Sequence, residues 1–261
     1  MRISVAATAP FGSDVLERLA ARHDVAALLT RPDSRAGRGR KEVAPAAKLV
    51  AERLGIPVLQ PERPTAELEL PGDAVVVAAY GLLIPESLLR RNLWLNVHPS
   101  LLPRWRGAAP VERALLAGDT ETGVTIHETV KELDAGPIAA QHSFPLTAED
   151  DAGTVYARAA ELAVELLDDV LPDPLFTPQE GEPTYAAKIE AADRELDLSR
   201  PDESLNRIRA LSPHIGARGE LGGRRVTIWK ARLEDGQLVP LEVQPEGGRR
   251  MAYDAFVRGL R

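Results

Sequence analysis

The chain has 261 residues, of which 44% are hydrophobic and 27% are charged, and its formal net charge is −7 at neutral pH. This length and composition predict a folded globular protein with one large domain and a smaller one. The absence of cysteine excludes disulfides, thiolate metal sites and a cysteine nucleophile. The first residues lack the pattern of a secretory signal and no apolar run is long enough to span a membrane, so we expect a cytoplasmic protein that does not bind membranes.

Positive charge is concentrated in two parts of this acidic chain. Residues 31–41, RPDSRAGRGRK, carry five basic side chains against one aspartate, and residues 207–261 carry eleven Lys or Arg against six Asp or Glu. Such an uneven distribution is typical of proteins that bind a polyanion. For the C-terminal stretch, an ordinary solvated surface explains the charge equally well.

Short apolar runs alternate with helical stretches along the first 90 residues. ISVAAT, DVAALLT, PVLQ and AVVVAAYG are predicted strands, and SDVLERLAARH, EVAPAAKLVAERLG and IPESLLRR are predicted helices. Ser13 is the predicted N-cap of the first helix and Gly55 the predicted C-cap of the second. The alternation predicts an α/β fold with a Rossmann-like parallel sheet. The first turn has Gly12 but lacks the three spaced glycines of a dinucleotide site, which excludes NAD or FAD there.

The rest of the chain contains further predicted strands and helices. WLNVH is a predicted strand, GAAPVERALLAG a helix, and GVTIHETV and PIAAQHSFPL a pair of strands around KELDAG. Asp150 and Asp151 are predicted to cap the helix that closes the unit. Proline-rich PDPLFTPQEGEP then reads as a linker, and RRVTIWKARL and QLVPLEVQ as strands of a small β unit. We therefore expect a catalytic domain over 1–171, a linker over 172–203 and a C-terminal β domain over 204–261.

The pair Asn96 and His98 lies at the end of the predicted strand WLNVH. Residues two apart on a strand project to the same face, and ligands of open parallel sheets bind at the carboxyl ends of strands. A histidine exchanges protons near neutral pH, and an asparagine amide can donate a hydrogen bond to an oxyanion. Asp134, in the loop ELDAG, is the candidate for steadying the imidazolium. This set suits acyl transfer without a protein nucleophile.

Other polar and aromatic residues carry less information. His23, His127, His142 and His214 stand alone without a second ligand at metal spacing, so we expect surface or core positions for them. Trp105, between two arginines, suits either a stacking platform for RNA or a brace for the neighbouring loop.

The stretch NVHPSLLPRWRGAAPVERALLAGDTETGVTI, followed by LDAGPI, closely resembles the formyltransferases that use 10-formyltetrahydrofolate, and among them the methionyl-tRNA formyltransferases. Further resemblance covers TAPFGSDVLERLA, RPDSRAGRGRK, PVLQPE, AYGLLIP, LTAEDDAGTVY, TYAAKI and LEVQPEGGRRM, which is nearly the whole chain. The Asn-x-His pattern with SLLP and the later aspartate is shared by the wider superfamily and implies the reaction. The basic loop with AGRG is the more specific feature and implies the acceptor.

The resemblance implies roles for individual residues. Asn96, His98 and Asp134 match the catalytic residues of the family. The donor 10-formyltetrahydrofolate and the acceptor, initiator methionyl-tRNA in translation initiation, are the implied substrates, with no metal and no obligatory protein partner. The implied binding residues are Ser100, Leu101, Leu102 and Pro103 for the folate and Arg31, Arg35, Arg38, Arg40 and Lys41 for the tRNA, with Arg38 as a principal contact.

The C-terminal region departs from the family pattern. The resemblance implies a β-barrel of the oligonucleotide-binding type, but roughly twenty residues of such a barrel are missing here. We expect a small, shortened β-barrel-like domain that still offers a basic surface to tRNA through Arg224, Arg225, Lys230 and Arg232. Two alternatives stay open: a formyltransferase for an amino sugar nucleotide or glycinamide ribotide, and a tRNA-binding relative without catalysis.

Overall fold

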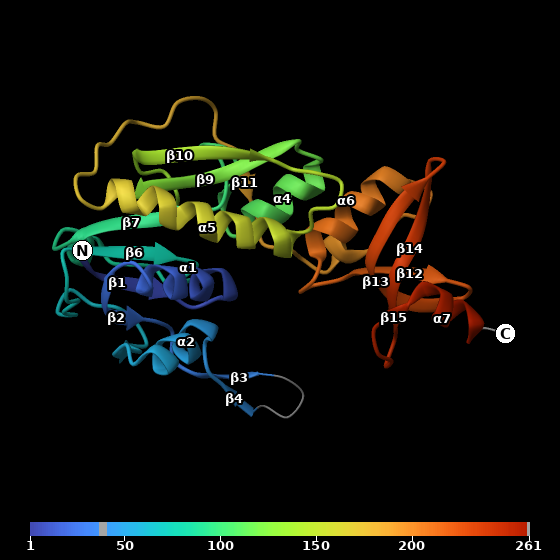
Figure 1. Ribbon diagram of the computed structural model, residues 1–261, viewed down its shortest axis with the longest axis horizontal. Coiled ribbons are helices and arrows are strands. Elements are labelled where there is room, and N and C mark those ends of the chain that lie inside the picture. The colour runs from blue at the N-terminus through green and yellow to red at the C-terminus, as the bar shows by residue number, and fades with distance from the viewer. Residues whose placement is uncertain (37–40, 260–261) are drawn as a thin grey trace. The chain divides into compact units, whose positions relative to one another are not determined.

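A computed structural model describes residues 1–36 and 41–259 of the chain (Figure 1). The chain folds into two compact units. Unit 1 comprises residues 1–106, 123–143 and 157–184, and unit 2 comprises 107–122, 144–156 and the residues from 185 onward. The division at 171 and 203 that the sequence suggests remains a prediction about folding domains.

Within the described residues, a seven-stranded sheet forms the centre of unit 1 (Figure 1). Its inner strands are parallel, as the sequence predicts, whereas β9 runs antiparallel to β7. Its strands, in spatial order, are β10 (Ile138–Pro145), β9 (Glu121–Glu128), β7 (Leu93–His98), β6 (Ala74–Ala78), β1 (Arg2–Ala7), β2 (Asp24–Leu29) and β5 (Val58–Leu59). The α/β prediction is therefore confirmed.

Helices of unit 1 cover this sheet through apolar faces. Helix α1 (Pro10–Ala20) contacts β1, β2 and β6, and α2 (Ala46–Leu54) contacts β2 and β5. Gly55 caps α2 in the left-handed conformation at φ +70°, as predicted. The predicted cap at Ser13 is wrong: α1 begins three residues earlier because Pro10 suits the first helical position, and the Ser13 hydroxyl donates to the Pro10 carbonyl instead.

A tight approach of helix to strand explains Gly12. A Cβ atom at this position would lie 2.1 Å from the carbonyl oxygen of Ala78 on β6 and 2.9 Å from the Cβ of Ala7 on β1. Gly12 therefore serves helix packing rather than a phosphate. Buried side chains around β6 form one core of this unit: Ala6, Leu29, Leu70, Val75, Val77, Tyr80, Leu88 and Trp94.

Short elements complete unit 1 around this sheet. Helix α3 (Glu86–Leu89) precedes β7, and the basic stretch begins and ends in a hairpin, β3 (Ser34–Ala36) and β4 (Lys41–Val43). The long helix α5 (Ala152–Val170) runs from unit 2 into unit 1, and the carboxylate of Asp151 accepts a hydrogen bond from the Thr154 amide in its first turn. Of the two predicted capping residues, Asp151 is confirmed, whereas the Asp150 carboxylate bonds to Thr147 and to the Thr154 hydroxyl.

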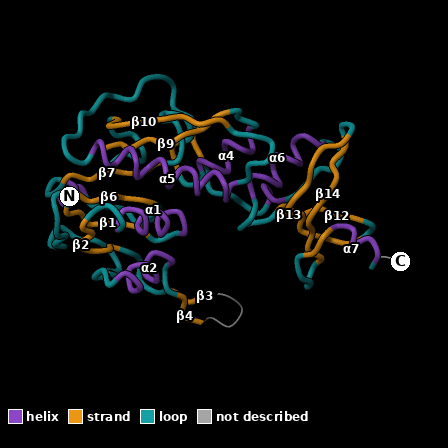
Figure 2. Tube along the Cα trace, in the orientation of Figure 1, coloured by secondary structure: helices purple, strands orange, loops and turns teal. Residues whose placement is uncertain are grey.

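Unit 2 contains a second sheet, whose strands come from the C-terminal part of the chain (Figure 2). The two predicted strands are confirmed as β13 (Arg224–Glu234) and β14 (Gln237–Pro245), and they pair antiparallel. In the described part of the chain the sheet has four strands, as in a reduced β unit, with β12 (Ala217–Leu221) and β15 (Met251–Ala252) at its edges. Sequence reasoning missed the helices α6 (Pro201–Leu211) and α7 (Tyr253–Arg258), which pack against it, and the short η1 (Ala192–Arg194). The predicted helix α4 (Pro110–Ala117) contacts α6.

The substitution Gly12→Ala should destabilise unit 1, because its methyl group would meet a backbone carbonyl that cannot rotate away. Overpacking of this kind costs about 1–3 kcal/mol of unfolding free energy, measurable as a lower urea midpoint at an unchanged slope. Gly219→Ala is the matched control, since the nearest atom to its new Cβ would lie at an ordinary 3.5 Å. Equal stability of the two variants would contradict the packing role of Gly12.

Candidate active site

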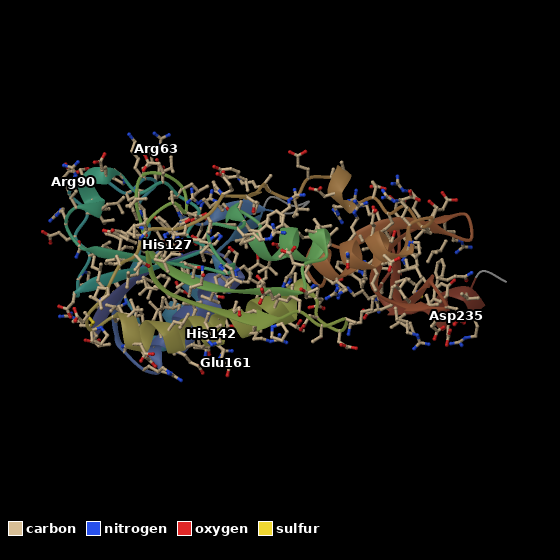
Figure 3. The ribbon with its side chains drawn as sticks, turned by 90° about the horizontal axis from the view of Figure 1, so that it is seen from above. Arg63, Arg90, His127, His142, Glu161 and Asp235 are labelled. Carbon is tan, nitrogen blue, oxygen red and sulfur yellow. The ribbon has the colours of Figure 1, made fainter. Side chains whose placement is uncertain are left out.

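Strand β7 places Asn96 and His98 at the carboxyl end of the parallel sheet. The two residues are separated by one position and therefore share a face of the strand, as predicted. His98 is only 4% exposed, and its cross-strand neighbour on β9 is Thr125. The cross-strand neighbour of Asn96 is His127, which is 2% exposed and lies inside the unit in Figure 3.

The imidazole of His98 lies between two acceptors. Its Nε2 is 2.8 Å from the backbone oxygen of Trp105, and its Nδ1 is 3.6 Å from the Oδ2 of Asp134. A carbonyl oxygen only accepts, so neutral His98 carries its proton on Nε2 and turns the Nδ1 lone pair toward Asp134. Burial lowers the pKa of His98, while the Asp134 charge and the Trp105 carbonyl act in the opposite direction. At neutral pH the ring is therefore neutral and ready to accept a proton.

The side chains of Asn96 and His127 fix each other's orientation. Nδ1 of His127 donates to the carbonyl of Glu128 at 2.8 Å, which leaves its Nε2 as an acceptor. The Nδ2 of Asn96 donates to this Nε2 at 3.0 Å and to Oδ1 of Asp134 at 3.2 Å. Both amide hydrogens of Asn96 therefore have acceptors inside the protein.

Asp134 reaches the two strand residues from a turn between β9 and β10. It is 8% exposed and adopts a positive φ of +51°, which is rare for a residue with a side chain. Two residues later, a Cβ at Gly136 would lie 1.9 Å from the carbonyl oxygen of Glu128, so this turn runs too close to β9 for any other residue. The structure thus brings Asn96, His98 and Asp134 together, and it adds His127.

Comparison with known proteins shows the family to which the chain belongs. Residues 1–171 match the family model described as formyl transferase. A methionyl-tRNA formyltransferase of Paracoccus denitrificans is 38% identical over 292 aligned positions that cover all of this chain and 98% of that protein. The chain belongs to the formyl transferase family, among the methionyl-tRNA formyltransferases.

Solved structures share the fold of this formyl transferase. A methionyl-tRNA formyltransferase from Clostridium thermocellum matches 94% of the chain and 98% of its own length with a TM-score of 0.65 at 16% identity. HypX from Aquifex aeolicus matches the whole chain with 49% of its own length at a TM-score of 0.70 and 19% identity. Since the Paracoccus alignment spans 292 positions and this chain has 261 residues, that relative has residues without a counterpart here.

The SLLP turn of this formyl transferase follows β7 directly. Ser100 is buried and its hydroxyl donates to the Arg104 carbonyl at 2.7 Å, while the carbonyl of Ser100 accepts from the hydroxyl of Thr125. Leu102 is 3% exposed and its amide donates to the same Thr125 hydroxyl, whereas Leu101 and Pro103 are half-buried. The turn is thus anchored to β9. Its role in folate binding stays a prediction.

The described part of the stretch predicted to bind tRNA includes β3 and the start of β4, which follow β2 at the carboxyl edge of the sheet. Arg31 is exposed, while Arg38 and Arg40, and the side chains of Arg35 and Lys41, lie outside the described residues. The base of the hairpin is anchored by Asp33, whose carboxylate accepts from Lys48 at 2.7 Å and from Gln60 at 2.7 Å. These hydrogen bonds lower the pKa of Asp33, the one from Gln60 most.

Trp105 contributes its backbone to the site, because its carbonyl holds His98. The guanidinium of Arg104 stacks over the indole ring, 4.4 Å from its centroid. This stacking leaves both predicted uses of the ring open. The four basic residues predicted in unit 2 are all exposed, and two form ion pairs there: Arg225 with Glu195, and Arg232 with Glu234.

Sequence reasoning missed His127 as a site residue. The sequence predicts that His127 lies in the strand GVTIHETV. Its position opposite Asn96, however, depends on a pairing between strands that joins residues 31 positions apart. The other histidines lie elsewhere: His23 bonds to Asp168, and His142 is exposed. Among residues 1–36 and 41–259 there is no cluster of three or more His, Asp or Glu suited to a metal ion, and no helix is long and apolar enough to cross a membrane.

Proposed function

We propose that this chain transfers the formyl group of 10-formyltetrahydrofolate to the amino group of methionyl-initiator tRNA, in the cytoplasm where translation begins. The observation that carries the proposal is the buried contact of His98 with Asp134 and the Trp105 carbonyl, beside Asn96. Relatives at 38–40% identity that span the whole or nearly the whole chain bear the name of this activity, which supports the choice of acceptor.

His98 is the proton carrier in this proposal. The neutral α-amine attacks the formyl carbon, and the amine proton passes to Nδ1 of His98 as the tetrahedral intermediate forms. The imidazolium then has an acceptor at each nitrogen, Asp134 at Nδ1 and the Trp105 carbonyl at Nε2. When the bond from the formyl carbon to the folate nitrogen breaks, His98 gives the proton to that nitrogen and returns to its neutral form. No covalent enzyme intermediate is needed.

Asn96 stabilises the oxygen of the tetrahedral intermediate by exchanging one of its internal hydrogen bonds. The longer bond, 3.2 Å to Asp134, is the one to exchange, because Asp134 gains a protonated partner in His98 at the same moment. The released N–H can then donate to the oxyanion, while His127 keeps the other hydrogen. Proton arrival on His98 and oxyanion stabilisation are thereby coupled.

The two substrates use different parts of unit 1. The anchored turn of Ser100, Leu101, Leu102 and Pro103 lies directly after His98 and holds the folate. Arg31, Arg35, Arg38, Arg40 and Lys41 hold the acceptor stem through its phosphates, since small acceptors do not need five cations in eleven residues. Four basic side chains of unit 2 add affinity for the phosphate backbone of the tRNA: Arg224, Arg225, Lys230 and Arg232. The ion pairs of Arg225 with Glu195 and of Arg232 with Glu234 weaken the contribution of those two arginines. No metal and no obligatory protein partner enters this scheme.

An acceptor assay tests the proposed function. With 10-formyltetrahydrofolate, the protein should formylate charged initiator tRNA and leave amino sugar nucleotides and glycinamide ribotide unmodified. Asn96→Ala should lower turnover about 100-fold or more while folate affinity stays the same, because an oxyanion donor acts mainly in the transition state. Formylation of a small acceptor, or binding of tRNA without any formyl transfer, would contradict the proposal.

Arg38→Ala should raise the KM for tRNA and leave the KM for folate unchanged. Log affinity for tRNA should also fall less steeply with log salt, because one fewer counterion is released on binding. Arg90→Ala is the matched control: Arg90 precedes β7 at the amino edge of the sheet and lies apart from His127 in Figure 3. If the two variants had the same affinity and salt slope as the wild type, the hairpin would not be the tRNA contact.

A further inference from the structure

Residues 177–184, here called the strap, lie within the stretch that the sequence predicts as a linker. The strap belongs to unit 1 and has many hydrogen bonds to the rest of that unit. Thr177 exchanges two backbone hydrogen bonds with Ile138 at the start of β10, of 2.7 and 2.9 Å. At the other end, the Thr184 amide donates to the Pro103 carbonyl, and its carbonyl accepts from the Arg106 amide. The strap therefore joins the two loops that surround His98.

Gln179 holds the loop that carries Asp134. Its Nε2 donates to the carbonyl oxygens of both Asp134 and Gly136, each at 2.8 Å. Its Oε1 accepts from Nη2 of Arg106 at 2.6 Å and from Nε at 3.1 Å, which fixes the orientation of the amide. One side chain thus ties the Asp134 turn to the loop that follows β7.

Thr184 holds the second loop in the same way. Its hydroxyl oxygen accepts from the backbone amide of Trp105 at 2.9 Å. The carbonyl of the same residue, Trp105, is the acceptor for Nε2 of His98. A shift of the Trp105 backbone would therefore move the partner of His98 directly.

Both held residues have a backbone conformation that needs support. Asp134 has φ +51° and Trp105 has φ +66°, in the left-handed region that residues with a Cβ rarely adopt. Such conformations cost free energy and persist where the surroundings enforce them. At these two turns, side chains of the strap contribute that enforcement.

We propose that Gln179 and Thr184 are positioning residues for formyl transfer, which hold the Asp134 carboxylate and the Trp105 carbonyl in place around His98. This inference rests on the proposed function for its kinetic consequence, but not for its structural one. The hydrogen bonds of both side chains go to the backbone of the two loops, so each acts on His98 through the backbone that it binds.

A positioning role of Gln179 and Thr184 has a consequence for the pKa of His98 that a purely structural role would lack. Burial lowers the pKa of His98, and Asp134 and the Trp105 carbonyl both act against that effect. Loosening either loop should therefore lower that pKa further. A general loss of stability would not shift the titration of this one residue.

The test compares Gln179→Ala and Thr184→Val with the wild type by NMR titration of the His98 ring, assigned through its absence in His98→Gln. We expect a lower pKa of His98 in both variants and a kcat at least about 10-fold lower, with unchanged KM for both substrates, since a misplacement of about 1 Å can cost up to about 100-fold. Thr184→Ser keeps the hydroxyl and should restore wild-type behaviour. Gln244→Ala, which removes an amide-to-carbonyl bond in unit 2, is the control and should change neither quantity.

A second measurement asks whether Gln179 acts through Asp134. In an Asp134→Asn background, Gln179→Ala should have almost no further effect on the His98 titration, because residues acting as one unit are not additive. An unshifted pKa of His98 in both single variants would overturn the proposal, and so would an equal shift in Thr184→Ser. If the wild type failed to formylate methionyl-tRNA while these titrations shifted as expected, the proposed function would fail and the positioning role would stand.

Discussion

The burial of His98 is the constraint on which the rest of the site depends. An imidazole at 4% exposure loses its hydration, so its charged form survives only where the protein supplies acceptors. The Trp105 carbonyl gives the charged ring one hydrogen bond, which contributes about 1.5–3 kcal/mol, and the Asp134 carboxylate adds attraction between opposite charges. Asp134 at one nitrogen and the Trp105 carbonyl at the other are those acceptors. Neither is a neighbour of His98 on its own strand.

Each acceptor depends on structure at some distance in the chain. Asp134 requires a left-handed turn and a glycine two residues later, because the turn passes against β9. The position of the Trp105 carbonyl depends on the loop after β7. Thr184, which lies 79 positions later in the chain, accepts a hydrogen bond from the Trp105 amide in that loop. The histidine that could carry protons in formyl transfer is thus stabilised by three separate segments. This explains why a stretch without helix or long strand, residues 177–184, is so densely hydrogen-bonded.

Local patterns predicted most of the elements that position the site and placed Asp134 beside His98, but they did not predict the other contacts around these two residues. The strand ending in Asn96 and His98 and the turn with Asp134 followed from periodicity and residue type. His127 was missed because its place opposite Asn96 depends on a register between distant strands, which no local pattern carries. Gln179 was missed because prolines around it indicated a linker. Ser13 failed as a cap because Pro10, three residues earlier, starts the helix more favourably.

The proton positions on the two site histidines are the most direct test of this arrangement. Ring ¹⁵N chemical shifts distinguish a protonated from an unprotonated imidazole nitrogen. At neutral pH we predict opposite tautomers, with the proton on Nε2 in His98, where it meets the Trp105 carbonyl, and on Nδ1 in His127, where it meets the Glu128 carbonyl. A proton on Nδ1 of His98 would remove the lone pair that accepts the amine proton, and a proton on Nε2 of His127 would exclude its hydrogen bond from Asn96. Either result would contradict the proposed coupling between His98, Asp134 and the amide of Asn96.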